Sequence, residues 1–302
     1  MIGKYSDIYI IGGSGFTGKR IVARLIENGV NVYALSRSNE ANRTLETLGA
    51  NPVNGDLSNS ESLSRFFEKI NNNESTAFIF VSSMGQYSIT DIVSLLRHYD
   101  IKRAIFTSTS SIFTKLPVKS KQPRLAAEQA IMQSDLDWTI VRPTMIYGAQ
   151  GDRNLERLIQ YIVKLPIPIF PLFDGGTALQ QPIHVDDLAN VYIELLSSVV
   201  GIGKAYNIGG PNPITLKELF DITIGVLNKK SLFVKLPVPY VARFIHLYES
   251  LSKHPKLKKE QILRITENKN VDITPAIDDL NFNPRSFFEG ISSEVHWFLD
   301  KK

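Results

Sequence analysis

The stretch that decides the fold is Ile8-Tyr9-Ile10-Ile11-Gly12-Gly13-Ser14-Gly15-Phe16-Thr17-Gly18. It begins as an apolar strand, breaks into spaced glycines, and continues over residues 19–26 in a helical pattern. A tight reversal without side chains lets the backbone approach a pyrophosphate and points free helix N–H groups at the anion. The stretch therefore predicts a dinucleotide-binding turn.

The context of these glycines strengthens that prediction. Gly13, Gly15 and Gly18 satisfy the pattern GxGxxG, and Gly12 with the last two satisfies the wider GxxGxxG. An ordinary glycine-rich turn is the alternative, since glycine spacing alone is weak. Here a strand precedes the turn, an amphipathic helix follows, and a second strand is expected over residues 30–36. We assign cofactor contacts in the turn to Gly12, Gly15, Phe16, Thr17 and Gly18.

Composition limits the function classes. The 302 residues are 43% hydrophobic, which predicts one large domain with a smaller appendage. Absence of cysteine removes disulfides and thiolate metal sites, and we assign no metal ligands. The net charge of +4 is dispersed and small, so no nucleic-acid partner is expected. Without a signal pattern or an apolar run of about 18 residues, we predict a cytoplasmic protein without a transmembrane segment. The basic run at 253–259 leaves open a peripheral membrane contact.

Short apolar strands alternate with helical patterns along the first half of the chain. Strands are expected near 51–53, 77–81, 104–108 and 138–141, and helices near 39–48, 60–70, 88–98 and 122–134. Strands that are apolar throughout and separated by helices indicate a parallel sheet covered on both faces. The fold class is therefore α/β, a doubly wound parallel sheet of the Rossmann type.

The second half of the chain predicts a smaller lobe. We place the dinucleotide-binding domain at residues 1–148 and a substrate lobe at 149–302, with elements of about 179–208 returning to the sheet. Prolines and glycines over residues 166–176 predict loops. Helices are expected near 153–164, 184–198, 215–228, 237–252, 257–267 and 286–298.

Further segments resemble the extended and atypical short-chain dehydrogenase/reductases of the nucleoside-diphosphate-sugar epimerase and dehydratase family. They are Asn54-Gly55-Asp56-Leu57, the run of residues 107–113, the run Val141-Arg142-Pro143-Thr144, and His184-Val185-Asp186-Asp187. The resemblance implies that Asp56 binds the adenine amino group and that Pro143 lies against the nicotinamide. A turn-forming aspartate and a strand-ending proline are the alternatives. For His184 and Asp186 we favour a structural role at a helix start.

Arg37 and Ser82 complete the predicted cofactor site. Arg37 follows the second strand, where an NAD-selective site more often carries an acid, and a cation there favours the 2′-phosphate of NADP. An ordinary surface arginine is the alternative. Ser82 ends the fourth strand and is expected beside the cofactor ribose. NADP is the predicted cofactor, with NAD second.

The catalytic pattern of the resembled family is incomplete in this chain. Those enzymes use a Ser or Thr with a YxxxK pair, in which the ammonium lowers the pKa of the phenol. No tyrosine here has that spacing, and Ser120 and Arg124 stand at the tyrosine and lysine positions. Thr109 remains as the hydroxyl member. Tyr147 is one nearby candidate for a substitute acid.

Two functions stay open. The first is an NAD(P)-binding, epimerase/dehydratase-like oxidoreductase that transfers hydride on a carbonyl or sugar-type small molecule. The second is a catalytically silent NADPH-binding redox sensor or assembly protein, as some atypical members related to a respiratory complex I subunit are. The resemblance also implies a homodimer.

Overall fold

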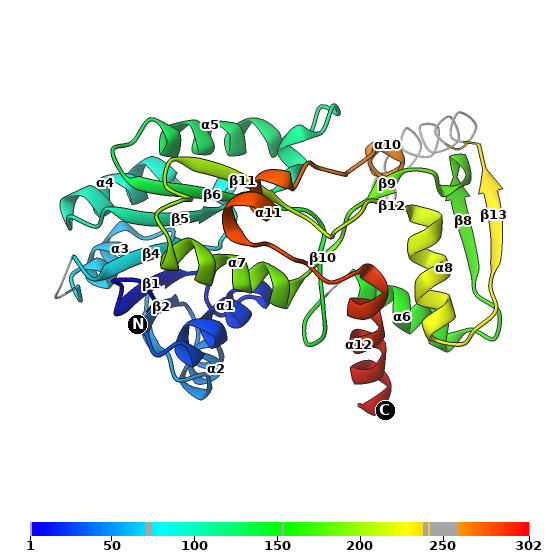
Figure 1. The fold of residues 1–302 in the computed structure, drawn as a ribbon, viewed down its shortest axis with the longest axis horizontal. Coiled ribbons are helices and arrows are strands. Elements are labelled where there is room, and N and C mark those ends of the chain that lie inside the picture. The colour runs from blue at the N-terminus through cyan, green and yellow to red at the C-terminus, as the bar shows by residue number, and fades with distance from the viewer. Residues whose placement is uncertain (1, 71–73, 153, 238–240, 242–258, 302) are drawn as a thin grey trace.

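The computed structural model describes residues 2–70, 74–152, 154–237, 241 and 259–301. Its centre is a seven-stranded sheet in the order β11-β6-β5-β4-β1-β2-β3 (Figure 1). All neighbouring strands in it run parallel. The strands are β1 Asp7–Ile11, β2 Asn31–Ser36, β3 Asn51–Asn54, β4 Thr76–Phe80, β5 Arg103–Thr107, β6 Asp137–Pro143 and β11 Lys204–Ile208.

Helices cover both faces of this sheet because its strands are apolar on both sides. Residues Ile8 and Ile10 of β1 point into one core, shared with α1 and α7, and Tyr9 and Ile11 point into the other, shared with α3, α4 and α5. The helices are α1 Phe16–Glu27, α2 Asn39–Thr47, α3 Ser60–Phe67, α4 Ile89–His98, α5 Lys121–Met132 and α7 Val185–Ser197. The predicted doubly wound α/β fold is confirmed.

The remaining elements form a lobe beyond the carboxyl ends of the sheet strands (Figure 1). Its helices are α6 Leu155–Lys164, α8 Leu216–Val226, α10 Lys259–Thr266 and α12 Phe287–Asp300, while α11 Thr274–Leu280 lies against β11. Three two-stranded sheets complete it: β7 Ile146–Tyr147 with β10 Ile183–His184, β9 Leu179–Gln180 with β12 Ile214–Thr215, and β8 Ile169–Phe173 with β13 Leu232–Leu236. Tyr147, Phe287 and Ile291 belong to its core.

The β8–β13 pair and α11 were not predicted. The prolines in residues 166–171 indicated a loop, yet β8 is tolerated as a strand because it has only β13 as a neighbour. The missing N–H of Pro171 can therefore face away from its partner. The helix predicted over 237–252 lies almost wholly outside the described residues. The division of the chain at residue 148 stays a prediction, although β11 of the second half completes the central sheet.

Short 3-10 segments follow two of the strand ends: η1 Met84–Gln86 after β4 and η2 Ser110–Phe113 after β5. A third, η3 Asp174–Gly176, follows β8. From β1 the sheet grows in two directions: β2 and β3 are added on one side, and β4 and the later strands on the other. In such sheets, ligands bind outside the carboxyl ends of the strands at the point where the direction changes, here between β1 and β4. The glycine turn and η1 both lie there.

Candidate functional site

The glycine turn at the end of β1 tolerates side chains at few positions. Gly12 has a φ of +90°, and a Cβ there would lie 3.0 Å from the amide nitrogen of Ser82. A Cβ on Gly18 would lie 2.0 Å from the carbonyl oxygen of Gly12. The first glycine therefore lets the turn pass close to β4, and the second lets helix α1 start directly against the turn.

The start of α1 is open to an anion. Gly15 is the N-cap residue and offers no side-chain cap, and the first turn carries no acidic side chain. The backbone N–H groups of the first turn of a helix have no partner within the helix, and the helix dipole favours negative charge there. This end of α1 has the geometry and the polarity of a phosphate site.

A cavity of about 360 Å³ extends from this turn across the carboxyl ends of β1, β2 and β4. We call it the dinucleotide cavity. Its walls are Ile11, Gly12, Ser14, Gly15, Leu35, Ser36, Arg37, Gly55, Leu57, Val81, Ser82, Ser83 and Tyr87. The hydroxyl oxygen of Ser36 is buried here and has no hydrogen-bond partner among the residues that the structure describes. A buried polar atom without a partner is costly, so a ligand hydroxyl or phosphate oxygen in this cavity would satisfy it.

The structure brings together only part of the predicted cofactor set. Gly12, Gly15, Arg37 and Ser82 line the dinucleotide cavity, and Gly18 shapes it through its contact with Gly12. Phe16, Thr17, Asp56 and Pro143 are not among the residues that line it. Contacts of these four with a cofactor stay predictions.

Asp56 has a local structural role of its own. Its carboxylate accepts hydrogen bonds from the backbone N–H of Ser58 at 2.8 Å and from the hydroxyl of Ser58 at 2.6 Å. These two bonds hold the pKa of Asp56 below its ordinary value. The aspartate thus forms the turn between β3 and α3, the alternative that the sequence left open.

The three predicted catalytic residues are connected through Ser111, which the sequence did not single out. Thr109 Oγ1 accepts from the backbone N–H of Ser111 at 3.2 Å. The Arg124 guanidinium donates to Ser111 Oγ at 3.3 Å and to Ser120 Oγ at 3.0 Å. Strand end β5, segment η2 and helix α5 thereby hold one hydroxyl cluster around a cation.

Thr109 and Ser111 open into a second cavity of about 360 Å³, which we call the polar cleft. It lies between η2 and the stretch that follows α10. Its walls are Thr109, Ser110, Ser111, Phe113, Thr114, Thr144, Met145, Asn154, Gln180, Arg264, Glu267, Asn268, Lys269, Asn270 and Val271. Most of these side chains are polar, and Phe113 and Met145 supply apolar surface.

The far wall of the polar cleft, residues 267–271, is fixed by hydrogen bonds. Glu267 accepts from the Thr114 hydroxyl at 2.6 Å and the Lys115 N–H at 2.7 Å. The backbone N–H of Lys269 donates to the carbonyl of Leu179 at 2.8 Å. The amide oxygen of Asn268 accepts from the backbone N–H of Leu179 at 2.9 Å. The wall therefore joins η2 to β9 and fixes the width of the cleft.

Two cationic side chains, Arg264 and Lys269, line the polar cleft. The pKa of Lys269 is lowered, first by desolvation and then by the charge of Arg264, while Glu267 opposes the shift. The Lys269 side chain is exposed to solvent.

Arg124 lines neither cavity, but it contacts the segments that form a wall of each. A Cβ on Gly85 would come within 3.2 Å of Arg124 Cγ, so the arginine packs against η1, directly after the Ser82–Ser83 wall of the dinucleotide cavity. Its guanidinium reaches Ser111 in the wall of the polar cleft. A cofactor and a substrate in the two cavities would therefore share Arg124 as a neighbour.

Tyr147 does not reach this cluster. Its ring packs on His184 and Phe287 with centroids 5.3 Å apart in each case, and its hydroxyl lies where a Cβ on Gly290 would be 2.0 Å away. Burial raises its pKa above the ordinary value. The tyrosine is a core residue of the second lobe and cannot replace the missing acid.

The segment from His184 to Asp187 is structural, as expected. His184 Nδ1 accepts from the Asp186 N–H at 3.3 Å, and burial, followed by the charge of Arg285, lowers its pKa to about 4. Asp187 pairs with Arg285 at 2.8 Å. These contacts fix the start of α7 and tie it to the chain before α12.

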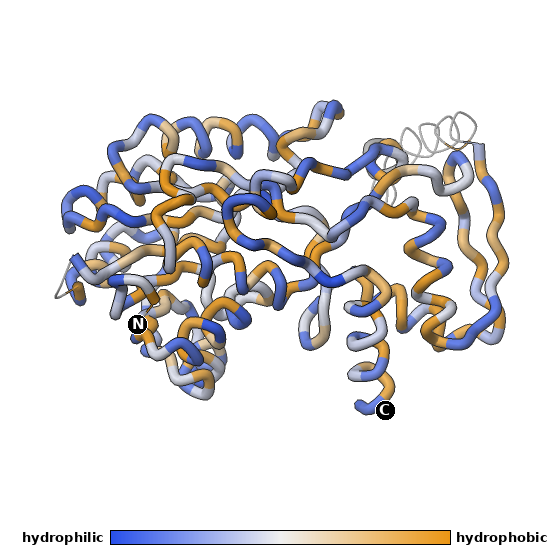
Figure 2. The backbone as a smooth tube through the Cα atoms, viewed as in Figure 1, coloured by the Kyte–Doolittle hydropathy of each residue, from blue (hydrophilic) through white to orange (hydrophobic). Residues whose placement is uncertain are grey.

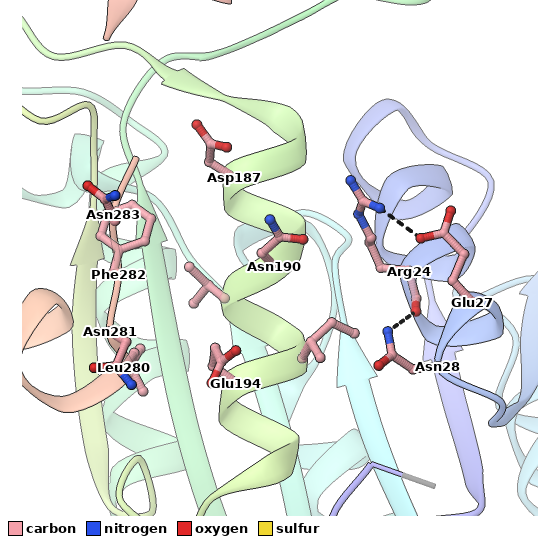
Figure 3. Close-up of a pocket in the computed structure, with 12 residues that line it drawn as sticks. Arg24, Glu27, Asn28, Asp187, Asn190, Glu194, Leu280, Asn281, Phe282 and Asn283 are labelled. Atoms are coloured by element: carbon pink, nitrogen blue, oxygen red, sulfur yellow. Dashed lines mark hydrogen bonds and ion pairs between the residues drawn. The ribbon is translucent and has the colours of Figure 1, made fainter. Parts of the chain in front are cut away.

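A separate groove of about 350 Å³ runs between α1, α7 and residues 280–283 (Figure 3). Arg24 pairs with Glu27 at 2.7 Å in its wall, and the amide of Asn28 donates to the carbonyl of Arg24 at 2.8 Å. None of the predicted cofactor or catalytic residues lines it. The groove is therefore separate from the dinucleotide cavity.

Within the described residues, no group of three or more metal-binding side chains is close enough to hold an ion. In the same part of the chain, no helix has the length and apolarity needed to cross a bilayer.

Comparison with known proteins agrees with this geometry. A family model described as NAD dependent epimerase/dehydratase matches residues 8–209. The chain is 28% identical over 244 residues to the mitochondrial NADH dehydrogenase (ubiquinone) 1 alpha subcomplex subunit 9 of Arabidopsis thaliana, spanning 76% of this chain and 60% of the relative. It is 24% identical over 275 residues to a 4-hydroxy-2-methyl-3-oxo-4-farnesyl-3,4-dihydroquinoline-1-oxide ketoreductase of Stigmatella aurantiaca, covering 80% of each chain.

A solved UDP-glucose 4-epimerase of Thermus thermophilus, in complex with NAD, superposes with a TM-score of 0.73 at 16% identity, covering 97% of this chain and 99% of that one. At that identity the likeness concerns the fold alone. The family match supports a nicotinamide dinucleotide, whereas the choice of NADP over NAD stays a prediction. Since residues 8–209 carry the glycine turn, the hydroxyl cluster and the whole central sheet, the chain belongs to the NAD-dependent epimerase/dehydratase family.

Proposed function

We propose that the protein is an NADP-preferring oxidoreductase that transfers hydride to or from a carbonyl or sugar-type carbon of a polar small molecule. The observation that carries the proposal is the contact of Arg124 with the segments that form a wall of the dinucleotide cavity and a wall of the polar cleft. A hydride acceptor must lie against the nicotinamide, so the two ligand spaces of such an enzyme must meet at one point.

The residues around the dinucleotide cavity fit a dinucleotide. The turn at Gly12 and the open start of α1 would hold the pyrophosphate, and Ser36 and Ser82 would bind ribose or phosphate oxygens. When bound, the nicotinamide supplies or accepts the hydride. Everything else that the reaction needs has to come from this chain.

Thr109 is suited to orienting a carbonyl. Its oxygen already accepts one hydrogen bond from Ser111, so its hydroxyl proton is free to be donated to a substrate oxygen in the polar cleft. Arg124 brings positive charge to the same place, which would stabilise negative charge developing on that oxygen. The cluster holds neither the tyrosine nor the lysine of the family's proton-shuttling pair, so the proton would come from solvent.

Arg37 supports the preference for NADP. It lines the dinucleotide cavity beside Ser36 at the end of β2, where a carboxylate would bind the ribose hydroxyls of NAD. A guanidinium there can pair with a 2′-phosphate.

Parallel calorimetric titration with NADPH and NADH tests whether the protein binds a nicotinamide dinucleotide and whether it prefers NADPH. We expect the wild-type chain to bind NADPH about tenfold more tightly, and Arg37→Asp to reverse that ratio. Arg43→Asp, on the neighbouring helix α2, is the matched control and should leave the ratio unchanged. An unchanged ratio in Arg37→Asp would remove the assignment of Arg37, and binding of neither nucleotide would remove the enzyme proposal.

A second function has its own support. Ser120 and Arg124 replace a proton-shuttling pair, and the Arabidopsis relative is named as a subunit of a larger dehydrogenase. A silent NADPH-binding assembly or sensor protein would bind NADPH. It would not oxidise the NADPH when ketones, aldehydes or keto sugars are offered as substrates. Oxidation of NADPH with any of them, lost in Thr109→Val, would decide for the enzyme. The cytoplasmic location and the homodimer stay predictions.

A further inference from the structure

The parallel pair β8–β13 forms a ribbon at the end of the molecule farthest from the central sheet (Figure 1). In its register Leu232 lies beside Ile169, and Val234 lies beside Pro171. The alternate pair, Phe170 and Phe233, lies on the opposite face and joins a small core with α6 and α8. One face of the ribbon is thus packed on the lobe, and the other is turned away from it.

The outward face is apolar and exposed. Ile169 is 50% exposed, Leu232 53% and Val234 39%, and Ile167, just before β8, is 60% exposed. Ile169 and Leu232 are register partners, and Val234 is two residues along the same face, so these three side chains form one patch. Contiguous exposed apolar surface marks an interaction site in most soluble proteins.

Within the described residues, lysines precede both strands at one end of the ribbon, and the exposed acid Asp174 follows β8 at the other end. Both strands begin at the same end of the ribbon, and Lys164, Lys229 and Lys230 precede them there. Figure 2 shows the hydrophilic connection that leads into β13 and the hydrophobic stretches of the strands that follow it. Residues 164–173 and 229–236 contain no Asp or Glu. The fourth lysine of these segments, Lys235, points to the other face, toward Gly175.

We propose that this ribbon face docks on an anionic lipid surface, with Ile167, Ile169 and Leu232 entering the interfacial region and Lys164 and Lys230 pairing with headgroup phosphates. An apolar patch beside cations is the arrangement that peripheral membrane contacts use. A second copy of the chain is the competing occupant, and the light-scattering measurement below tests for it. The proposal does not depend on catalysis by the protein.

Cosedimentation of the full chain with vesicles tests the proposal. Phosphatidylcholine vesicles with about 30 mol% phosphatidylglycerol should bind the protein, and pure phosphatidylcholine vesicles should bind it much more weakly. Lys164→Gln with Lys230→Gln should lower the partition onto anionic vesicles about 25-fold, since each basic residue contributes about fivefold. Ile167→Gln with Leu232→Gln should lower it about tenfold.

Matched control variants distinguish binding through the ribbon from non-specific binding to vesicles. Val199→Gln changes an apolar residue that is 79% exposed elsewhere, and Lys69→Gln removes an exposed lysine near α3. Both should partition as the wild type does. Unchanged NADPH titration in the ribbon variants would show that they are folded. The proposal fails if the wild type does not bind anionic vesicles, if ribbon and control variants partition equally, or if light scattering shows a dimer that the ribbon variants abolish.

Discussion

At the scale of single residues, the site is built around hydroxyls whose hydrogen bonds are only partly used. Among the described residues, Ser36 has a buried oxygen without a partner, and the half-buried Thr109 hydroxyl accepts a bond from Ser111. A buried group like Ser36 is costly in a folded chain unless a ligand satisfies it. These two hydroxyls mark the two cavities more sharply than the glycines do, because glycines also serve the turn itself.

Thr109→Val tests whether the Thr109 hydroxyl orients the substrate. The substitution keeps the shape of the side chain and removes the donor to a substrate oxygen, so we expect kcat to fall about 100-fold with NADPH affinity unchanged. Thr109→Ser keeps the hydroxyl and should restore most of the rate. Because the hydroxyl also caps η2, a loss of about 1 kcal/mol in unfolding free energy should accompany the valine variant alone. Equal turnover in valine and wild-type proteins would leave Thr109 with only the capping role.

At the scale of elements, helix α12 carries a group that makes its packing depend on pH. Glu294 is 1% exposed in the core between α12 and its neighbours. Desolvation first, and then the charges of Asp152 and Glu156, raise its pKa from 4.5 to about 8. Tyr147 is also near it, since the charge of Glu294 raises the pKa of that tyrosine. At neutral pH the carboxyl is therefore protonated in the folded chain.

Stability should fall as this carboxyl is forced to ionise. Between pH 4.5 and about 8 the unfolded chain has lost the proton that the folded chain keeps, so the unfolding free energy falls by about 1.4 kcal/mol per pH unit and levels off above pH 8. Glu294→Gln removes the dependence, and its advantage over the wild type should grow across that window. Urea unfolding at several pH values measures the difference in unfolding free energy between Glu294→Gln and the wild type. Glu46→Gln, which changes an exposed glutamate, is the control. Parallel stability profiles for Glu294→Gln and wild type would refute the assignment.

At the scale of the whole molecule, one buried side chain joins segments far apart in the sequence. Gln181 donates to the Gly210 carbonyl at 2.8 Å and accepts from the Val271 N–H at 2.8 Å. It thus ties the crossover after β9 to the strand end of β11 and to the wall of the polar cleft.

Gln181→Ala should leave two buried backbone groups unpaired and cost about 2–4 kcal/mol of unfolding free energy. It should also raise KM for the substrate, because the wall at 267–271 loses an anchor, while NADPH affinity stays unchanged. Gln129→Ala, on the exposed side of α5, should change unfolding free energy by less than about 0.5 kcal/mol. Urea unfolding of the three proteins measures the difference. A wild-type unfolding curve for Gln181→Ala would show that water replaces the lost bonds.

The sequence by itself determined the doubly wound sheet, the dinucleotide turn and the family, because apolar strand runs and glycine spacing are local properties of the chain. It also located Thr109, Ser120 and Arg124. Only the tertiary structure showed that Ser111 connects them, that residues 264–271 close the polar cleft, and that β8 and β13 pair across about 60 residues of sequence. Those features depend on contacts between distant segments, and no local periodicity encodes which segments meet.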